Sequence, residues 1–572
     1  MFICEAILKK KYFILPLIFY YITLSAQIDR ETRAVWLASN FRLDWPPPTY
    51  NQEKQKEALK DILDNLESKN YNTIYFQVRF NGTVLFESSY EPWSYYLTGI
   101  VGGKPDYDPL EFIIEEAHKR GMELHAWFNM VRCYSGTEKN VFNYPQHLIT
   151  THPNWVQKIY LDGQTSYWLD PGLPEVRKYL TDLVVEVAKK YDVDGIHLDY
   201  IRYPSREMDD SFSYSIYGED KNKAQWRRDN ITDIVGGIKK QITQINKDIK
   251  LGAAPIGVYF NKPNASGMQA FSEVYQESRL WLKEGLVDYL APQIYWDFDN
   301  NPKFNLLVDD WVNDAFGRNI VVGIASYKEE VKNETPRMID YTRKAGAEGV
   351  AFFRYEHIKN QNYFDSKAFP APMQWKEHGP PIAPANLSAE ILNEETNKVK
   401  LTWAIPQVLM GSEEIKYYAI YNLDKPTDEL SSENLFKVIP AEKNELVFTI
   451  INPAKINYYF HVRSLDKFWD ESSTGTNIVT LKIPQFKNIA QNITSNLGAR
   501  LLKQNGINYI VVESDKEDSV IVTANNIEKQ INKSAVKKGI NIIELEELLK
   551  DYNSLQLWFV KKQTKVNLKK NN

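Results

Sequence analysis

The chain has 572 residues, of which 43% are hydrophobic and 25% charged, and its formal net charge is -5. This composition is typical of a globular protein with a sizeable core, and the length predicts about three domains. The negative charge argues against a general nucleic-acid binder, because affinity for phosphates needs a basic surface. Among the 14 Trp and 35 Tyr residues, we expect core packing for most rings and sugar stacking only for rings at the mouth of a site.

Residues 1–26 are predicted to be a signal peptide. Lys9 to Lys11 precede an apolar run from Tyr12 to Leu24, and Ser25-Ala26 offers a small-residue cleavage site. The run is shorter than the ~20 residues of a spanning helix, so we expect export to the periplasm or cell envelope, or secretion, without a stable membrane span. Cleavage would remove Cys4 and leave Cys133 without a partner for an intramolecular disulfide.

Residues 27–375 read as an alternation of strands and helices. Eight strands separated mostly by helices predict a TIM barrel. The rival is a doubly wound open sheet, but Asn40 to Asp44 stand where that fold usually carries a Gly-rich phosphate turn. The predicted strands are 33–39, 73–79, 123–129, 194–204, 251–257, 289–296, 320–326 and 349–356, and the predicted helices are 52–69, 109–119, 174–190, 221–245, 271–284 and 335–345.

The stretch 194–204, DGIHLDYIRYP, carries the clearest functional signal. Its period of two predicts a strand with His197 and Asp199 on one face. In a barrel of parallel strands, Asp199 then lies at the carboxyl end of the fourth strand, where catalytic groups gather.

Polar side chains recur on inward positions of four of these strands. Each buried polar group costs free energy unless it is paired, so a polar ligand is the simplest reason for them, with internal hydrogen bonds as the alternative. The candidate substrate-binding residues are Arg79, His125, Trp127, Asn129, His197, Tyr200, Arg202, Gln293, Tyr295 and Trp296.

Carboxylates at a polar mouth with an aromatic rim suggest glycoside hydrolysis. This chemistry normally uses one carboxylate as nucleophile or base and a second as acid. Asp199 is the candidate for the first role, and Asp297 and Glu356 compete for the second, with Asp44 and Asp170 behind them. No HxH or HExxH spacing and no GxSxG elbow occur in the sequence, so we expect no metal and no cofactor.

Several separated motifs resemble the glycosyl hydrolase-like 10 family. They are RAVW at 33–36, NTIYFQVR at 72–79, the run through KRGMELHAWF ending at 128, LDPGLPEVR at 169–177 and, above all, 194–204. The resemblance implies a TIM barrel, export to the envelope and hydrolysis of glycan strands that contain N-acetylhexosamine, with peptidoglycan lacking stem peptides as substrate. It also implies that Asp199 is the family's acidic position after the fourth strand and that the LDPG segment is a wall of the cleft.

A fainter likeness to chitinase-type barrels rests on Asp194-Gly195, Asp199 and the run from Gln293 to Asp297. Ile201, however, stands where those enzymes keep their proton-donating Glu, so an acid must come from another strand. The alternative function is therefore a barrel that binds glycan without cleaving it.

Two further domains are predicted, at 376–486 and 487–572. Short strands around Trp403, 417–421 and 458–466 resemble a fibronectin type III module, either as a spacer that supports the barrel or as a glycan binder. The last segment has predicted strands at 509–513 and 555–560 around a helix at 544–549. The sequence leaves its type, the glycan linkage, the stereochemical outcome and the oligomeric state open.

Overall fold

The computed structural model describes residues 29–135, 142, 144–161, 163–218, 221–376, 379–393, 397–407, 414–450, 457–482, 499–504, 507–514, 516–524, 532–545, 554–560 and 564–569. The predicted signal peptide therefore lies outside the described residues. Cys133 is buried and free. No helix in the described ranges is long and apolar enough to cross a bilayer.

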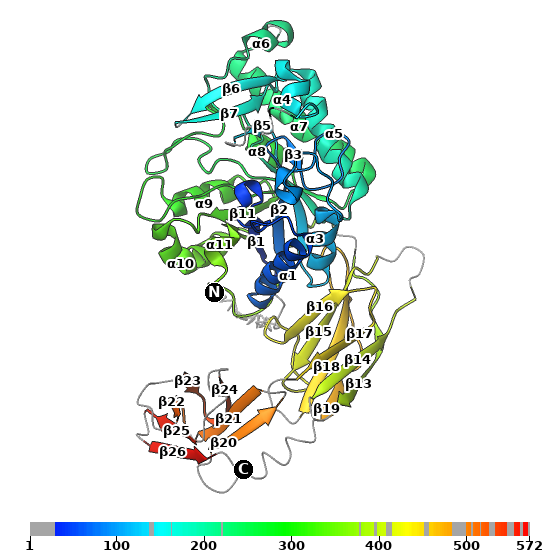
Figure 1. Ribbon diagram of the computed structural model, residues 1–572, viewed down its shortest axis with the longest axis vertical. Coiled ribbons are helices and arrows are strands. Elements are labelled where there is room, and N and C mark those ends of the chain that lie inside the picture. The colour runs from blue at the N-terminus through cyan, green and yellow to red at the C-terminus, as the bar shows by residue number, and fades with distance from the viewer. Residues whose placement is uncertain are drawn as a thin grey trace, which may run out of the picture.

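Among the described residues, eight parallel strands close into a barrel, which confirms the predicted fold (Figure 1). Closure is achieved by the first strand, which pairs with both the second and the last. The strands are β1 (Thr32–Leu37), β2 (Thr73–Phe80), β4 (Glu123–Asn129), β8 (Gly195–Asp199), β9 (Lys250–Ala253), β10 (Tyr289–Leu290), β11 (Asn319–Ile324) and β12 (Gly349–Phe353).

A set of helices lies around the barrel (Figure 1). In the first of them, Leu59, Ile62, Leu63 and Leu66 face the core, and Asn51 caps the amino end by accepting a hydrogen bond from the amide of Lys54. These helices are α1 (Gln52–Ser68), α3 (Pro109–His118), α5 (Pro174–Lys190), α7 (Lys223–Ile245), α8 (Ser278–Lys283), α9 (Phe304–Asn313) and α10 (Glu329–Ala345). The helix α9 was not predicted.

Short elements occupy the loops of the barrel. A small antiparallel sheet of order β5-β7-β6 follows the end of β4, and Figure 1 shows it beyond the barrel at the top of the view. The short helices are η1 (Asn40–Arg42), α2 (Tyr95–Thr98), α4 (Leu148–Thr151), η3 (Pro153–Trp155), α6 (Ser211–Tyr217) and α11 (Tyr355–Ile358), and the short strands are β3 (Thr83–Val84), β5 (Arg132–Tyr134), β6 (Val156–Leu161) and β7 (Gln164–Leu169).

Several barrel strands are shorter than predicted, and the difference is largest for β8 and β10. Strand β8 ends at Asp199 because Tyr200 adopts a left-handed backbone conformation with φ of 49°, which breaks the extended run. Strand β10 ends at Leu290, and beyond Pro292, which has no amide hydrogen to donate, Gln293 forms only isolated bridges to Ile256 and Gly323.

Beyond residue 384 the chain forms antiparallel sheets. One has the order β13-β14-β17 and another β16-β15-β18-β19; the fibronectin type III assignment stays a prediction. Their strands are β13 (Ala385–Asn393), β14 (Lys398–Ala404), β15 (Tyr417–Leu423), β16 (Leu435–Pro440), β17 (Glu445–Thr449), β18 (Asn457–Leu465) and β19 (Val479–Lys482).

The C-terminal segment forms two more antiparallel sheets, of order β20-β21-β24 and β23-β22-β25-β26. The predicted helix at 544–549 is wrong at its start, because Glu544 and Leu545 belong to a strand that pairs with β21 along its length; residues 546–549 lie outside the described residues. The strands are β20 (Ala499–Gln504), β21 (Ile507–Ser514), β22 (Asp518–Ala524), β23 (Asn532–Val536), β24 (Gly539–Leu545), β25 (Ser554–Phe559) and β26 (Thr564–Lys569).

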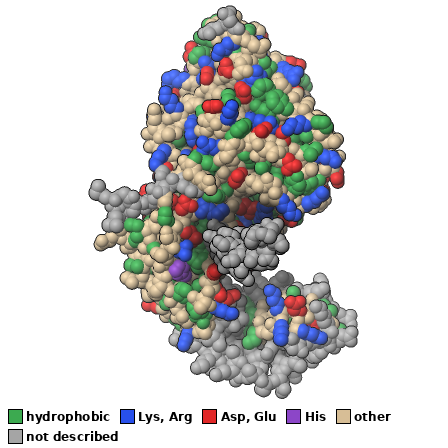
Figure 2. Space-filling view, turned by 180° about the vertical axis from the view of Figure 1, so that it is seen from behind, with side chains coloured by type: hydrophobic (Ala, Val, Ile, Leu, Met, Phe, Trp, Pro, Cys, Tyr) green, Lys and Arg blue, Asp and Glu red, His purple; other side chains and the backbone are tan. Residues whose placement is uncertain are grey.

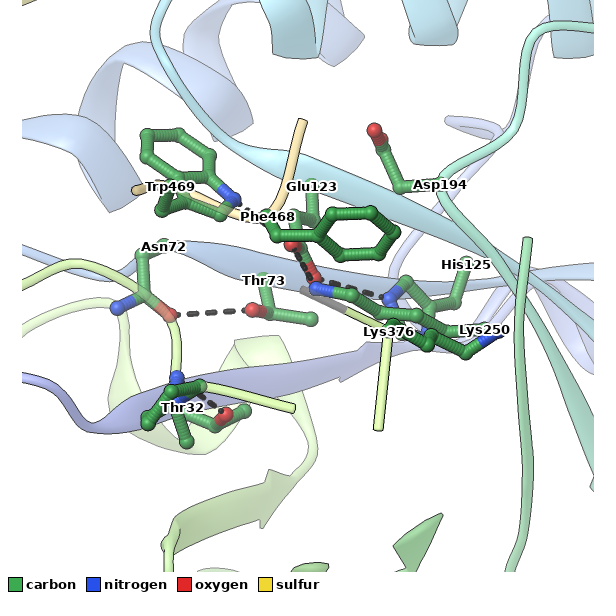
Figure 3. A network of polar contacts seen from close by, with 12 residues as sticks. Thr32, Asn72, Thr73, Glu123, His125, Asp194, Lys250, Lys376, Phe468 and Trp469 are labelled. Atoms are coloured by element: carbon green, nitrogen blue, oxygen red, sulfur yellow. Dashed lines mark hydrogen bonds and ion pairs between the residues drawn. The ribbon is translucent and has the colours of Figure 1, made fainter. Parts of the chain in front are cut away.

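The two antiparallel sheets formed by β13 to β19, here called the sandwich, contact the amino end of the barrel, and Trp469 lies in this contact. The indole Nε1 of Trp469 donates to Oε1 of Glu123, the first residue of β4, at 2.7 Å (Figure 3). Its ring stacks on Tyr417 at 4.8 Å and is 1% exposed. Arg30, just before β1, donates to the carbonyl oxygens of Phe468 and Trp469. The sandwich thus closes the amino end of the barrel with a ring that also pairs a buried carboxylate.

Asp194, the first residue of the DGIHLDYIRYP stretch, is a structural clamp. Its Oδ2 accepts hydrogen bonds from the amide of Leu124 and from Nε2 of His118, both at 2.8 Å. Burial opposes the charge of Asp194, but His118 outweighs it, and the pKa of this carboxyl falls to about 2. Although burial acts against it, Asp194 also raises the pKa of His118. The pair joins α3 to the turn before β8.

Charged side chains of both signs are interspersed over the face of the barrel that Figure 2 shows. A field of a single positive sign, as nucleic-acid binding requires, does not cover that face.

Trp469→Ala is expected to lower the free energy of unfolding of the barrel by about 3 to 5 kcal/mol, because it leaves a cavity and removes a donor from buried Glu123. Urea unfolding followed by circular dichroism measures the change. Trp558→Ala, at a ring that is 39% exposed, is the control and should cost less than about 1 kcal/mol. Equal effects of the two variants would contradict the role of Trp469.

Asp194→Asn is expected to destabilise the fold by about 1 to 3 kcal/mol, with a defined pH dependence. The lowered pKa of Asp194 stabilises the fold above the ordinary value of 3.8, and this contribution is lost as pH falls toward about 2. The raised pKa of His118 stabilises below the ordinary value of 6.5, and this contribution is lost as pH rises through the folded pKa. Thermal unfolding should therefore show the largest difference from wild type between these two ordinary values. Asp192→Asn, at a side chain that is 71% exposed, should show little difference at any pH.

Candidate active site

Asp199 lies at the carboxyl end of β8, as predicted, and its carboxylate is held from three sides. Oδ1 accepts from the amide of Tyr200 at 2.8 Å and from Nε2 of Gln293 at 3.3 Å. Oδ2 accepts from Nε1 of Trp127 at 3.2 Å. The register that pairs Asn129 with Asp199 places β4 beside it. The donors come from the neighbouring strand β4, from the next residue of the chain and from the segment after β10, so the barrel itself fixes the position of the carboxylate.

Burial dominates the electrostatics of this carboxylate. Asp199 is 7% exposed, and burial raises its pKa above the ordinary value, although the Tyr200 amide, Arg202, Arg132 and Trp127 all lower it. A carboxylate that is poorly solvated but held by directed hydrogen bonds is a stronger nucleophile or base than one in water.

The loop after β10 brings three predicted residues to the same place. Gln293, Tyr295 and Trp296 are half-buried, and the first of them donates to Asp199. Burial, and then the charge of Asp199, hold the pKa of Tyr295 well above its ordinary value, so the phenol is neutral. Lys328 lies 5.7 Å from the centre of the Trp296 ring. Polar and aromatic groups therefore meet beside the carboxylate, which is a surface suited to a sugar.

Tyr200 and Arg202 also lie at the mouth, and both are half-buried. A residue that sequence reasoning missed joins them, because the guanidinium carbon of Arg132 lies 3.8 Å from the centre of the Tyr200 ring. The available signal was weak: Arg132 follows three residues after the predicted strand that ends in Asn129.

Asn129 lies at the end of β4, opposite Asp199. It is 2% exposed and accepts a hydrogen bond on Oδ1 from Nε2 of Gln77 at 3.2 Å. Oε1 of Gln77 in turn accepts from the amides of Ser39 and Asn40. Through its Oδ1, Asn129 therefore links β4 by way of Gln77 to the loop after β1.

His125 and His197 lie in the barrel interior, so the predicted contact with substrate does not fit them. Their rings belong to a chain of hydrogen bonds in which Tyr289 Oη lies 2.7 Å from Nδ1 of His125 and 3.0 Å from Nδ1 of His197. Nε1 of Trp36 donates to Nε2 of His197, and Nε2 of His125 lies 3.1 Å from Glu123. Burial holds the pKa of His197 well below its ordinary value, so this imidazole is neutral and accepts the indole hydrogen.

Arg79 is likewise not available to substrate. Its side chain is fully buried and forms an ion pair of 2.6 Å with Glu91. Nη1 donates to the carbonyl oxygens of Asn129 and Met130. Arg79 therefore fixes the end of β4, and the partner that explains it, Glu91, comes from the long loop after β2.

The two candidate acids, Asp297 and Glu356, lie in different environments. The carboxylate of Asp297 accepts from the amides of Asp299 and Asn300 and from Nδ2 of Asn300. Although burial opposes them, these hydrogen bonds from Asn300 and Asp299 lower its pKa, which disfavours a proton donor. Glu356, on α11 directly after β12, is 46% exposed and pairs with Lys359 at 2.7 Å.

The remaining acidic candidates have structural partners. Asp44 is buried against Arg354 at 2.6 Å, and Asp170 accepts a hydrogen bond from Ser213 at 2.6 Å. Burial raises the pKa of both carboxyls. In the part of the chain that the structure describes, no group of three or more His, Cys, Asp or Glu side chains is placed to hold a metal ion.

Comparison with known proteins gives a consistent family. The chain matches Glycosyl hydrolase-like 10 over residues 31–376. It is 35% identical over 345 residues to Glycosyl hydrolase DigH of Escherichia coli strain K12, covering 55% of this chain and 78% of DigH. It is 31% identical over 485 residues to Glycosyl hydrolase YngK of Bacillus subtilis strain 168, covering 78% of this chain and 93% of YngK. Among solved structures, the PgaB (BpsB) glycoside hydrolase domain of Bordetella bronchiseptica matches with a TM-score of 0.43 and 13% identity, over 58% of this chain and 96% of that domain.

Trp127→Phe is expected to raise the pKa of Asp199 further, because the indole hydrogen that lowers it is removed. Carboxyl-carbon NMR against pH measures the shift, with Asp199→Asn identifying the resonance. Trp45→Phe removes another buried indole donor, which binds the carbonyl oxygen of Gln55, and should leave this titration unchanged. A titration of Asp199 that does not move in Trp127→Phe would show that the indole has no part in setting it.

Proposed function

Because the chain belongs to the glycosyl hydrolase-like 10 family, we propose that it is an exported glycoside hydrolase that cleaves peptidoglycan strands lacking stem peptides. The glycosidase activity follows from the family, and the substrate and location are the proposal. The motifs at 169–177 and 194–204 and the apolar run after Lys11 support it.

The observation that carries the mechanism is the buried carboxylate of Asp199, held by Trp127, Tyr200 and Gln293. Each of its two oxygens accepts at least one hydrogen bond, so the group is oriented before substrate arrives. In the proposed reaction Asp199 either attacks the anomeric carbon or takes a proton from the attacking water. The neutral phenol of Tyr295 and the amide of Gln293 provide hydrogen bonds to sugar hydroxyl or acetamido groups.

For the acid we propose Glu356. Its position directly after β12 puts it at the carboxyl end of the barrel, and its side chain is open to solvent, paired only at the surface with Lys359. Asp297 is the weaker candidate, because its hydrogen bonds hold it in the ionised form. The proton of Glu356 would pass to the glycosidic oxygen as the bond to the anomeric carbon breaks.

Purified protein is expected to release new reducing ends from peptide-free glycan strands, and Asp199→Asn should lower the rate at least about 100-fold while keeping the fold. Glu356→Gln should lower it similarly on these strands but should leave cleavage of an aryl glycoside nearly intact, because that leaving group departs without a proton. Reducing-end release and aryl release are measured for the same preparations, with circular dichroism to check folding.

The matched control is Asp297→Asn, which should retain most of the activity on both substrates. Glycan strands that bind without yielding reducing ends would contradict the proposed function. If Asp297→Asn shows the pattern expected of Glu356→Gln, the acid has been assigned to the wrong residue.

A further inference from the structure

Arg132 is brought to the mouth by the same pairing that positions Asp199. Beyond the end of β4, the amide of Met130 donates to the carbonyl oxygen of Asp199 at 2.8 Å, and the amide of Val131 donates to that of Tyr200 at 3.1 Å. The next residue, Arg132, opens β5 and pairs with Trp168 of β7. Its guanidinium therefore lies on the Tyr200 ring, at 3.8 Å.

Arg202 reaches the same ring from the other chain segment. Its guanidinium carbon lies 5.0 Å from the centre of the Tyr200 ring and 5.3 Å from that of Trp168. One of its nitrogens donates to the carbonyl oxygen of Tyr203 at 3.2 Å. The two guanidinium groups thus share one aromatic support beside Asp199.

Neither guanidinium has a carboxylate partner. Throughout the described ranges, no Asp or Glu oxygen lies within 4.0 Å of Arg132 or Arg202, whereas the buried Arg79 and Arg227 pair with Glu91 and Asp210. Although burial raises the pKa of Asp199, both guanidinium groups lower it. One carboxylate beside two guanidinium groups leaves a net positive charge. Keeping an unpaired guanidinium partly buried costs free energy, so this excess of positive charge needs a reason.

We propose that Arg132 and Arg202 form a clamp for a carboxylate carried by the glycan next to the bond that is cleaved. This inference rests on the proposed function and names the feature of the strand that is recognised. In peptide-free strands the lactyl ether of each muramic acid ends in a free carboxylate, whereas in peptide-substituted strands that group is a neutral amide. Planar guanidinium groups match a carboxylate with paired hydrogen bonds, so the clamp selects strands from which the peptides have been removed.

Equilibrium binding tests the clamp without depending on turnover. The full chain carrying Asp199→Asn is titrated with a peptide-free tetrasaccharide from such strands and with the same tetrasaccharide after conversion of its carboxylates to primary amides. The acidic form is expected to bind about tenfold more tightly, and added salt should reduce the difference. Arg132→Gln and Arg202→Gln, each in this background, should reduce the preference about threefold to tenfold while leaving affinity for the amide form unchanged.

Two control variants distinguish the effect of losing the positive charge from the effect of losing the contact with the Tyr200 ring. Arg132→Lys keeps the charge and should retain more of the preference than Arg132→Gln. Arg206→Gln, at a side chain that pairs with Glu273 and is 59% exposed, should retain all of it.

Equal affinity for the acidic and amide forms in the Asp199→Asn background would overturn the clamp, as would equal loss of both forms in Arg132→Gln. Failure to bind either form would overturn it too. Reducing-end release by wild type is scored separately, so a clamp that fails in an active hydrolase and a protein that fails to cleave glycan give different results.

Discussion

The pairing of β4 with β8 is the interaction on which the site depends. Its register sets Asn129 opposite Asp199, and the hydrogen bonds continue beyond both strands to Met130 and Val131. One ladder therefore fixes the donor Trp127, the carboxylate and the start of β5. Because both strands lie inside a closed sheet, neither can shift its register without moving every inward side chain to the other face. A site built on strands in this way is more precisely held than one built on loops.

The same barrel is filled along its axis by polar rings instead of branched aliphatic layers, which are the usual filling. Trp36, His197, Tyr289 and His125 form a continuous hydrogen-bonded chain that ends at Glu123. Glu123 would be a costly buried charge by itself, but Lys250 pairs with it and Trp469 donates to it. The sandwich thereby completes a network that begins under the active site, which ties the stability of the barrel to a segment 346 residues away along the chain.

Most of the fold could be predicted from the sequence, because the strands of a barrel appear in it as short apolar runs between helices. The site was harder to predict, because the alternation of side chains shows which face of a strand a residue occupies but not how far along the barrel axis it lies. His125 and Asn129 share a face, as do His197 and Asp199, yet the two histidines lie in the barrel interior while Asn129 and Asp199 lie at the strand ends. The sequence also did not show which protein groups bind the side chains of Arg79 and Asp297. Their partners, Glu91 and the 299–300 turn, lie in loops whose course no periodicity encodes.

The unusual features of the mouth are those that stability by itself would not favour. Tyr200 holds a left-handed backbone conformation with φ of 49°, which costs a non-glycine residue of the order of 1 kcal/mol. Asp199 is buried, and the guanidinium carbons of Arg132 and Arg202 lie 3.8 and 5.0 Å from the centre of the Tyr200 ring. Apolar side chains of similar size would satisfy the core at lower cost. The barrel instead keeps one carboxylate, two cations and a strained tyrosine at a single strand end. We infer that binding of a ligand with a negative group, which pairs with the two guanidinium groups, offsets the free energy that these features cost the folded protein.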